Sequence, residues 1–203
     1  MENNSVKPPT RSTVRKTAAP RSQLDRGHWI ESAIDVLARE GVSGLRVEGL
    51  AKRCGVTKGS FYWHFKDRQD LLAAVLEHWR EGRIRDIEKT TSFTPGMERP
   101  QLHYAIEVYG ASRNRKGMSI ELAVRDWARH DPQAAAVVEA VDLYRLDCTR
   151  KLFVAAGMSD AEAKSRSLLL YACVFGLSLM HYAHFDDHPD DLKRRIAERI
   201  ISA

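Results

Sequence analysis

The chain has 203 residues, 43% of them hydrophobic and 29% charged, which suits a globular protein with a core of its own. Its net charge of +5 arises in residues 1–92, which hold 17 Lys and Arg against 12 Asp and Glu, whereas residues 93–203 hold 15 of each. This favours an anionic partner for the N-terminal part, and the three scattered cysteines and short apolar stretches favour a cytoplasmic protein over a secreted or membrane-spanning one.

Residues 1–22 are predicted to form a disordered basic arm, because they offer almost no large apolar side chains to a core. Two roles stay open for this arm. It can follow DNA phosphates or enter a minor groove, or it can serve as a solubilising tail. Its basic residues are Lys7, Arg11, Arg15, Lys16 and Arg21.

Helical periodicity begins near Gln23 and predicts a helix that ends at Gly41. Two short helical segments follow, residues 47–54 and 57–64. A longer helix is expected from about Asp67, whose carboxylate can cap it, and this helix would connect the first domain to the second.

The two short segments have the spacing of a helix-turn-helix. Two helices that cross steeply need a small residue at the crossing, which Ala51 supplies, and a turn residue that tolerates positive φ, which Gly55 supplies. Thr57 can then cap the second helix. The first turn of that helix would enter the major groove of DNA. It contains Lys58, Gly59 and Ser60.

Four aromatic residues lie close together in "FYWHF", residues 61–65. Phe61 and Phe65 are four apart and share one helix face, so we expect them to anchor the helix on the core. Tyr62 and Trp63 lie on other faces, and if exposed they indicate a contact surface. The alternative is an aromatic cluster that is buried on all sides.

Residues 26–72 resemble the DNA-binding domain of the TetR (tetracycline-repressor-like) family. The resemblance implies that the second short helix and the residues after it face DNA, and that Arg68 holds a phosphate. This chain departs from the family in having Arg46 where a polar capping residue is common, and Arg46 can replace a phosphate contact by its charge. The implied DNA-facing residues are Thr57, Lys58, Ser60, Tyr62, Trp63, His64 and Lys66. The matching positions are Arg26, Ile30, Ala33, Gly41, Val47, Leu50, Ala51, Gly55, Val56, Thr57, Lys58, Gly59, Ser60, Phe61, Tyr62, His64, Phe65, Asp67, Arg68, Leu71 and Leu72.

The remaining chain is predicted to be helical, with a linker at residues 90–100 and breaks at 115–117, 131–132, 157–159 and 186–190. We therefore expect an all-α protein of about nine helices. A three-helix helix-turn-helix domain at residues 23–66 would precede a larger helical bundle at 67–203. The bundle would contain the linker helix and serve for ligand binding and dimerisation.

Residues 168–180 are apolar on nearly every side, which predicts a helix that packs on its own core and on a second copy of the chain. The resemblance implies the same, because family members dimerise through their last two helices. A dimer would place two recognition helices about 34 Å apart, as a palindromic operator requires. The expected dimerisation residues are Leu168, Tyr171, Ala172, Phe175, Leu179, Ile196 and Ile200.

No catalytic signature is present, so neither an enzyme nor a cofactor is expected. The family places a ligand pocket in the larger domain, although each candidate lining residue is equally compatible with the core. We expect a DNA-binding transcriptional regulator, in particular a ligand-responsive repressor. An activator or effector-independent regulator, and a helical metal-binding enzyme that uses His181 and His184, are the alternatives. The candidate ligand-binding residues are His103, Tyr104, Tyr109, Trp127 and Tyr144.

Overall fold

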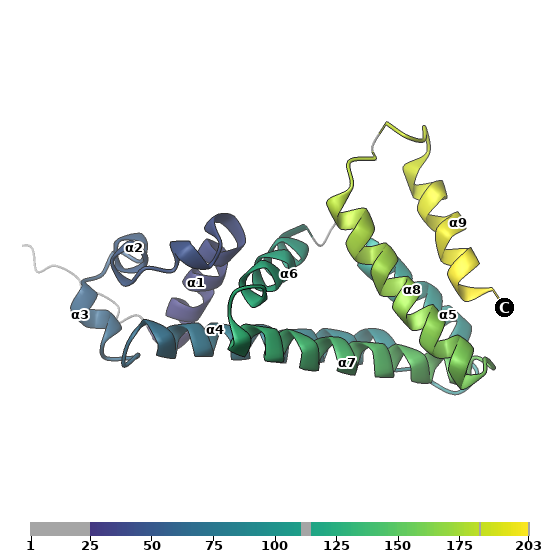
Figure 1. Ribbon diagram of the computed structural model, residues 1–203, viewed down its shortest axis with the longest axis horizontal. Coiled ribbons are helices and arrows are strands. Elements are labelled where there is room, and N and C mark those ends of the chain that lie inside the picture. The colour runs from purple at the N-terminus through teal and green to yellow at the C-terminus, as the bar shows by residue number, and fades with distance from the viewer. Residues whose placement is uncertain (1–24, 111–114, 183, 203) are drawn as a thin grey trace, which may run out of the picture.

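The computed structural model describes residues 25–110, 115–182 and 184–202, without the side chains of residues 109, 110, 115 and 116. The predicted basic arm at 1–22 lies outside the described residues. The described parts contain nine α-helices, one 3-10 turn and no strand, which confirms the all-α prediction. Figure 1 shows α4 (Arg68–Thr91) and α7 (Pro132–Ala155) lying along the longest axis of the molecule.

Three helices form the N-terminal end of the molecule, where α1 (Arg26–Glu40) packs against α2 (Val47–Arg53) and α2 against α3 (Lys58–Phe61). A short 3-10 turn, η1 (Val42–Gly44), joins α1 to α2. Gly55, in the turn between α2 and α3, has φ of 68°, as the helix-turn-helix prediction requires.

The helix α3 is shorter than the predicted segment 57–64, because Tyr62, Trp63 and His64 form a turn after it. The amide groups of His64 and Phe65 both donate to the carbonyl oxygen of Phe61, at 2.9 and 3.0 Å, and close this turn. Gly59 lowers the helix propensity of this segment. With the turn in place, Phe61 and Phe65 are both buried in the same core.

The predicted ends of several later helices are confirmed by their caps. Asp67 accepts from the amide of Asp70 at 2.9 Å and starts α4. Asp131 accepts from two amides at the start of α7, chiefly that of Ala134, and these bonds hold the pKa of its carboxyl below the usual value. Ser159 caps α8 (Asp160–Leu179), and Pro189 begins α9 (Pro189–Ile201).

One predicted break is wrong, because α6 (Arg115–Ala128) begins at Arg115 and includes residues 115–117. The helix before it is α5 (Glu98–Gly110), and residues 111–114 between them lie outside the described part. Arginine and lysine are good helix formers, and Gly117 is tolerated inside the helix at a modest cost.

Two hydrophobic cores hold the molecule together. The larger core runs from α1, α2 and α3 into α4, α6 and the first half of α7, so that α6 packs directly on α1. The smaller core joins α5, the end of α7, α8 and α9. Figure 1 places α6 between the helix-turn-helix and the far end that holds α8 and α9. The predicted domain boundaries stay a prediction, but one continuous core crosses the boundary near residue 66.

Candidate nucleic-acid interface

Phe61 and Phe65 anchor the recognition segment on the core. Both side chains are buried, and their rings stack with centroids 5.2 Å apart. The edge of the Trp29 ring packs on Phe61 with a centroid distance of 5.4 Å. The predicted inward direction of both phenylalanines is therefore confirmed, and α3 is fixed to α1 by aromatic contacts.

Tyr62 and Trp63 point away from the core. The side chain of Trp63 is 82% exposed and that of Tyr62 is 53% exposed, so the aromatic cluster is not buried on all sides. Two large aromatic side chains left in water on one turn mark a contact surface. They combine flat apolar faces with an indole N–H and a phenol O–H, which can pack on sugar and bases and donate to phosphate.

Lys58 is paired with an acidic neighbour on the same surface. Its ammonium group donates to a carboxylate oxygen of Glu48 on α2, and both side chains are well exposed. The hydrogen bond from Lys58 lowers the pKa of Glu48, and the same bond raises the pKa of Lys58. An exposed pair of this kind is held weakly, so Lys58 can exchange Glu48 for a phosphate or a guanine edge.

We expect the variant Glu48→Gln to bind DNA about threefold to tenfold more tightly at low salt, because it removes a negative charge beside the phosphates and frees Lys58. Gel-shift titrations against random-sequence duplex at two salt concentrations measure this effect. The control Glu139→Gln removes an exposed carboxylate from α7 and should leave the affinity unchanged. Equal affinities for wild type and Glu48→Gln would contradict the role given to this ion pair.

The other predicted DNA-facing residues differ in how they are presented. Lys66, Thr57 and Arg46 are exposed, and Ser60 is half-buried. Thr57 occupies the position that precedes α3 and Arg46 the position that precedes α2, but neither side chain makes a capping hydrogen bond within the described residues. Gly59 faces open space, since an added Cβ would meet only the Thr57 hydroxyl at 3.7 Å.

Arg68 and His64 are less exposed to solvent than DNA-facing residues were expected to be. Arg68 donates to the carbonyl oxygens of Leu45 at 2.7 Å and Val42 at 2.9 Å, so it ties the start of α4 to the η1 turn. His64 is half-buried, and its Nε2 is buried without a hydrogen-bond partner among the described residues. Phosphate contacts by these two residues stay predictions.

A large cavity of about 1250 Å³ lies between α5, α6, α8 and α9, with Arg83 of α4 and Arg145 of α7 also on its wall. His103 lines it as predicted, but Tyr104, Trp127 and Tyr144 do not. The side chain of Tyr109 lies outside the described residues.

Two of the misplaced residues have other partners in the fold. Trp127 is buried in the larger core beside α1. Tyr144 donates to Glu88 at 2.9 Å, a bond that raises its pKa to about 12. Tyr104, Trp127 and Tyr144 therefore lie outside the lining of this cavity, and ligand contacts by them stay predictions.

The cavity wall contains charged residues that the sequence prediction missed. Glu121 of α6 and Arg145 of α7 are 3% and 4% exposed and form an ion pair with closest atoms 3.3 Å apart. Arg125 binds the same carboxylate at 2.8 Å and reaches Asp142 at 2.5 Å. The only sequence signal was spacing, because these charges recur three and four residues apart on helices with apolar neighbours.

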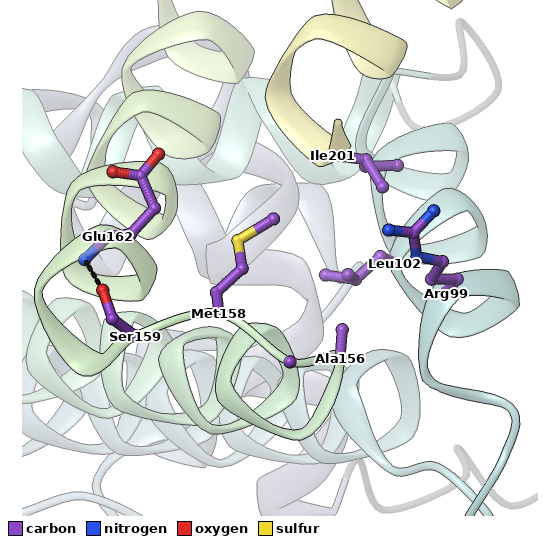
Figure 2. A pocket seen from close by; sticks show the side chains of 8 residues that line it. Arg99, Leu102, Ala156, Met158, Ser159, Glu162 and Ile201 are labelled. Carbon is purple, nitrogen blue, oxygen red and sulfur yellow. Dashed lines mark hydrogen bonds between the residues drawn. The ribbon is translucent and has the colours of Figure 1, made fainter. Parts of the chain in front are cut away.

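A second cavity of about 310 Å³ lies at the end of the molecule far from α3. Figure 2 shows Met158 between Leu102 and Ile201 on one side and the Ser159 cap on the other. Its Glu162 side chain is already bound by Arg166 at 2.5 Å. The exposed guanidinium of Arg99 also lines this small cavity.

The predicted dimerisation residues divide into two groups. Leu168, Ala172 and Leu179 of α8 are exposed, and Phe175 and Ile196 are half-buried. Tyr171 and Ile200, by contrast, are buried inside the chain, so both are removed from the predicted dimer surface. Leu169 and Met180, which the prediction omitted, are exposed on or beside α8.

The histidines near residue 181 do not form the predicted helical pair. His181 and His184 lie in the loop between α8 and α9. Within the described ranges, no group of three or more His, Cys, Asp or Glu side chains comes close enough to hold a metal ion. No described helix is long and apolar enough to cross a membrane.

Comparison with known proteins supports the helix-turn-helix assignment. Residues 30–75 match the family model described as bacterial regulatory proteins, tetR family. The HTH-type transcriptional regulator AcrR of Shigella flexneri is 38% identical over 75 residues, which are 37% of this chain and 34% of that protein. The class A tetracycline repressor from transposon 1721 of Escherichia coli is 44% identical over 56 residues, 28% of this chain and 26% of that protein. The matched region covers only about a third of the AcrR relative.

Solved structures share the fold over most of the chain. A transcriptional regulator from Rhodococcus sp. Rha1 has a TM-score of 0.69 at 20% identity, over 88% of this chain and 94% of that one. A putative transcriptional regulator from Saccharomonospora viridis, solved in complex with choline, has a TM-score of 0.70 at 17% identity, over 87% and 94%. From the family match and the sequence relatives, we conclude that the N-terminal helix-turn-helix is of the tetR type, and the solved structures share the fold of most of the chain.

Proposed function

We propose that this protein is a cytoplasmic, sequence-specific DNA-binding transcriptional regulator, in particular a ligand-responsive repressor that acts as a homodimer. The observation that carries the proposal is the exposed recognition surface at α3. Trp63 and Tyr62 project into water from a helix-turn-helix that buries Phe61 and Phe65 beneath them. Lys58 and Lys66 add positive charge on either side of these aromatic rings.

The names of related proteins point the same way. The AcrR relative is called a transcriptional regulator, and the class A relative is called a tetracycline repressor protein. The Saccharomonospora viridis structure contains choline, which is a small molecule. We propose the same activity for this chain, namely repression that ends when a small molecule releases the protein from DNA. The large cavity can hold such a ligand.

The homodimer is supported by the surface of α8. Leu168, Leu169 and Leu179 are exposed on this helix, and Met180 directly after it is exposed as well. A contiguous apolar surface of this kind is unusual on a monomer and is covered when a second copy packs against it. The α8 surface lies far from α3 in Figure 1, so two recognition segments would be held well apart on DNA.

The helix α6 is the proposed link between ligand and DNA. Glu121 of α6 reaches the cavity wall, and Val124 and Trp127, further along the same helix, are buried in the core shared with α1. A ligand that moved Glu121 would therefore act on the position of the helix-turn-helix. The long helix α4, which the sequence predicted to connect the two domains, would carry the same displacement along its length.

The double variant Tyr62→Ala/Lys66→Ala tests the proposed DNA surface. We expect its affinity for an operator selected from random DNA to fall by about 10- to 100-fold, and its salt dependence to decrease by about one unit of slope. Gel-shift titration measures both effects. Lys164→Ala, on α8, removes an exposed lysine far from α3 and should bind as wild type.

Unchanged operator affinity in the double variant would show that the recognition surface is elsewhere. Transcription from the selected operator, measured with and without the protein, separates a repressor from an activator of the same architecture.

A further inference from the structure

Two arginines on the wall of the large cavity have hydrogen-bond donors that the fold leaves unused. They are Arg145 of α7 and Arg83 of α4. Buried polar groups of folded proteins are almost always hydrogen-bonded, and an unpaired donor on a cavity wall is a place for a ligand acceptor.

Arg145 is a buried cation with poor partners. Its side chain is 4% exposed, and its contacts with Glu121 are long, at 3.3 and 3.5 Å. The Nε of Arg145 has no hydrogen-bond partner among the described residues. Glu121 meanwhile receives two shorter bonds from Arg125, at 2.8 and 3.0 Å, so that Arg145 is the less satisfied of the two cations.

Arg83 lies on α4, which packs on α7, and it shows the same pattern. Its terminal nitrogen binds Asp86 at 2.7 Å, while its Nε is buried and has no partner within the described parts of the chain. Two guanidinium groups of the cavity lining thus have an Nε that finds no hydrogen-bond partner among the described residues. Arginine is suited to carboxylates because its planar fork can give two parallel hydrogen bonds.

Around Arg145, the groups that would bind a cationic ligand are already occupied. The guanidinium of Arg125 lies over the Phe175 ring at 4.2 Å, and that of Arg145 lies 5.3 Å from the Tyr171 ring. Glu121, the buried carboxylate of the lining, is bound by Arg125 and Arg145. A quaternary ammonium needs a free aromatic face or a free carboxylate, so the part of the wall around Arg145 and Glu121 disfavours it, whereas Glu107, Asp190 and Glu198 line other parts of the cavity.

The rest of the cavity lining is part apolar and part polar. Ile106, Met118, Leu122, Val174, Leu177 and Ile196 contribute to its lining. A volume of about 1250 Å³ is large enough for a molecule with an extended hydrocarbon part. The cavity therefore combines apolar surface with the two guanidinium groups of Arg83 and Arg145.

We propose that the effector of this regulator is an amphiphilic carboxylate whose anionic head binds Arg145 and Arg83. The proposal rests on the proposed function, since it names the chemical class of that effector. The head group takes over the Arg145 donors that now reach Glu121 at long distance. Glu121 lies on α6, which packs on α1, so binding at this point acts on the helix-turn-helix.

Thermal melting of the full chain with three matched probes tests the proposal. The probes are decanoate, decanol and decyltrimethylammonium, each below its micelle concentration. At about one hundred times its Kd, decanoate is expected to raise the melting temperature by about 5 °C, while the neutral and cationic probes leave it nearly unchanged. Equal effects of all three probes, a larger effect of the cation, or no effect of decanoate would each overturn the proposal.

Two variants locate the anionic head. Arg83→Met is expected to weaken decanoate binding about tenfold, because a charge-assisted hydrogen bond is lost. Arg80→Met is the matched control, since Arg80 lies on the same helix, pairs with Glu77 and does not line the cavity. Arg145→Met is expected to abolish binding if it folds. Equal decanoate affinity in Arg83→Met and Arg80→Met would place the head group elsewhere and overturn the assignment.

Operator binding without any probe is measured in parallel. A protein that binds its operator but is not stabilised by decanoate leaves the DNA-binding proposal intact and refutes only the effector class. A protein that binds decanoate but no DNA refutes the proposed function and keeps the ligand site.

Discussion

The variant Phe61→Ala is expected to lower the free energy of unfolding by about 3–5 kcal/mol and to abolish operator binding. Phe61 is completely buried, and it contacts the rings of Trp29, Tyr62 and Phe65. Its removal leaves a cavity at the point where α3 meets α1, and the segment that carries Trp63 loses its support. Urea unfolding followed by circular dichroism, together with gel-shift titration, measures the two losses.

Trp63→Ala is the matched control for Phe61→Ala, because it removes a larger aromatic side chain from a position two residues later. This side chain is 82% exposed, so the unfolding free energy should stay within about 0.5 kcal/mol of wild type. Operator affinity should nevertheless fall clearly. If Trp63→Ala destabilised the protein as much as Phe61→Ala, then Trp63 would be a packing residue and the proposed DNA surface would lose its main support.

The contrast between Phe61 and Trp63 could be predicted from the sequence because it depends on local geometry. Spacing of four residues placed Phe61 and Phe65 on one face, and the turn between α2 and α3 required the positive φ found at Gly55. Capping by Asp67 and Asp131 is local in the same sense. Such features involve residues within one or two turns of each other, and so a sequence pattern contains the necessary information.

The ligand site could not be predicted in the same way because its residues come from different helices. Glu121 and Arg145 are 24 residues apart, and each has the composition of an exposed charge until the helices are packed. Aromatic side chains with polar tips were a poor guide, since Trp127 packs beside α1 and Tyr144 reaches Glu88. The length of α3 was also missed, because a turn after Phe61 satisfies the backbone nearly as well as a further helical turn.

The variant Glu121→Gln is expected to lower the free energy of unfolding by about 3–5 kcal/mol, because it leaves Arg145 buried without its anionic partner. Asp142 cannot replace the lost charge fully, since it lies 3.5 Å from Arg145 and is already bound to Arg125. Urea unfolding measures the loss. Asp126→Asn, which removes an exposed carboxylate from the same helix, should change stability by less than about 0.5 kcal/mol.

The double variant Glu121→Gln/Arg145→Met separates the charge effect from a packing effect. Removing both partners takes away the unpaired buried cation, so most of the stability lost in Glu121→Gln should return. If the double variant were less stable than Glu121→Gln, the pair would stabilise the fold through packing and hydrogen bonds beyond its charge balance. The same double variant should no longer respond to decanoate, because Arg145 is the proposed binding group for its head. A stable protein without this response would show that the buried ion pair serves the effector more than it serves the fold.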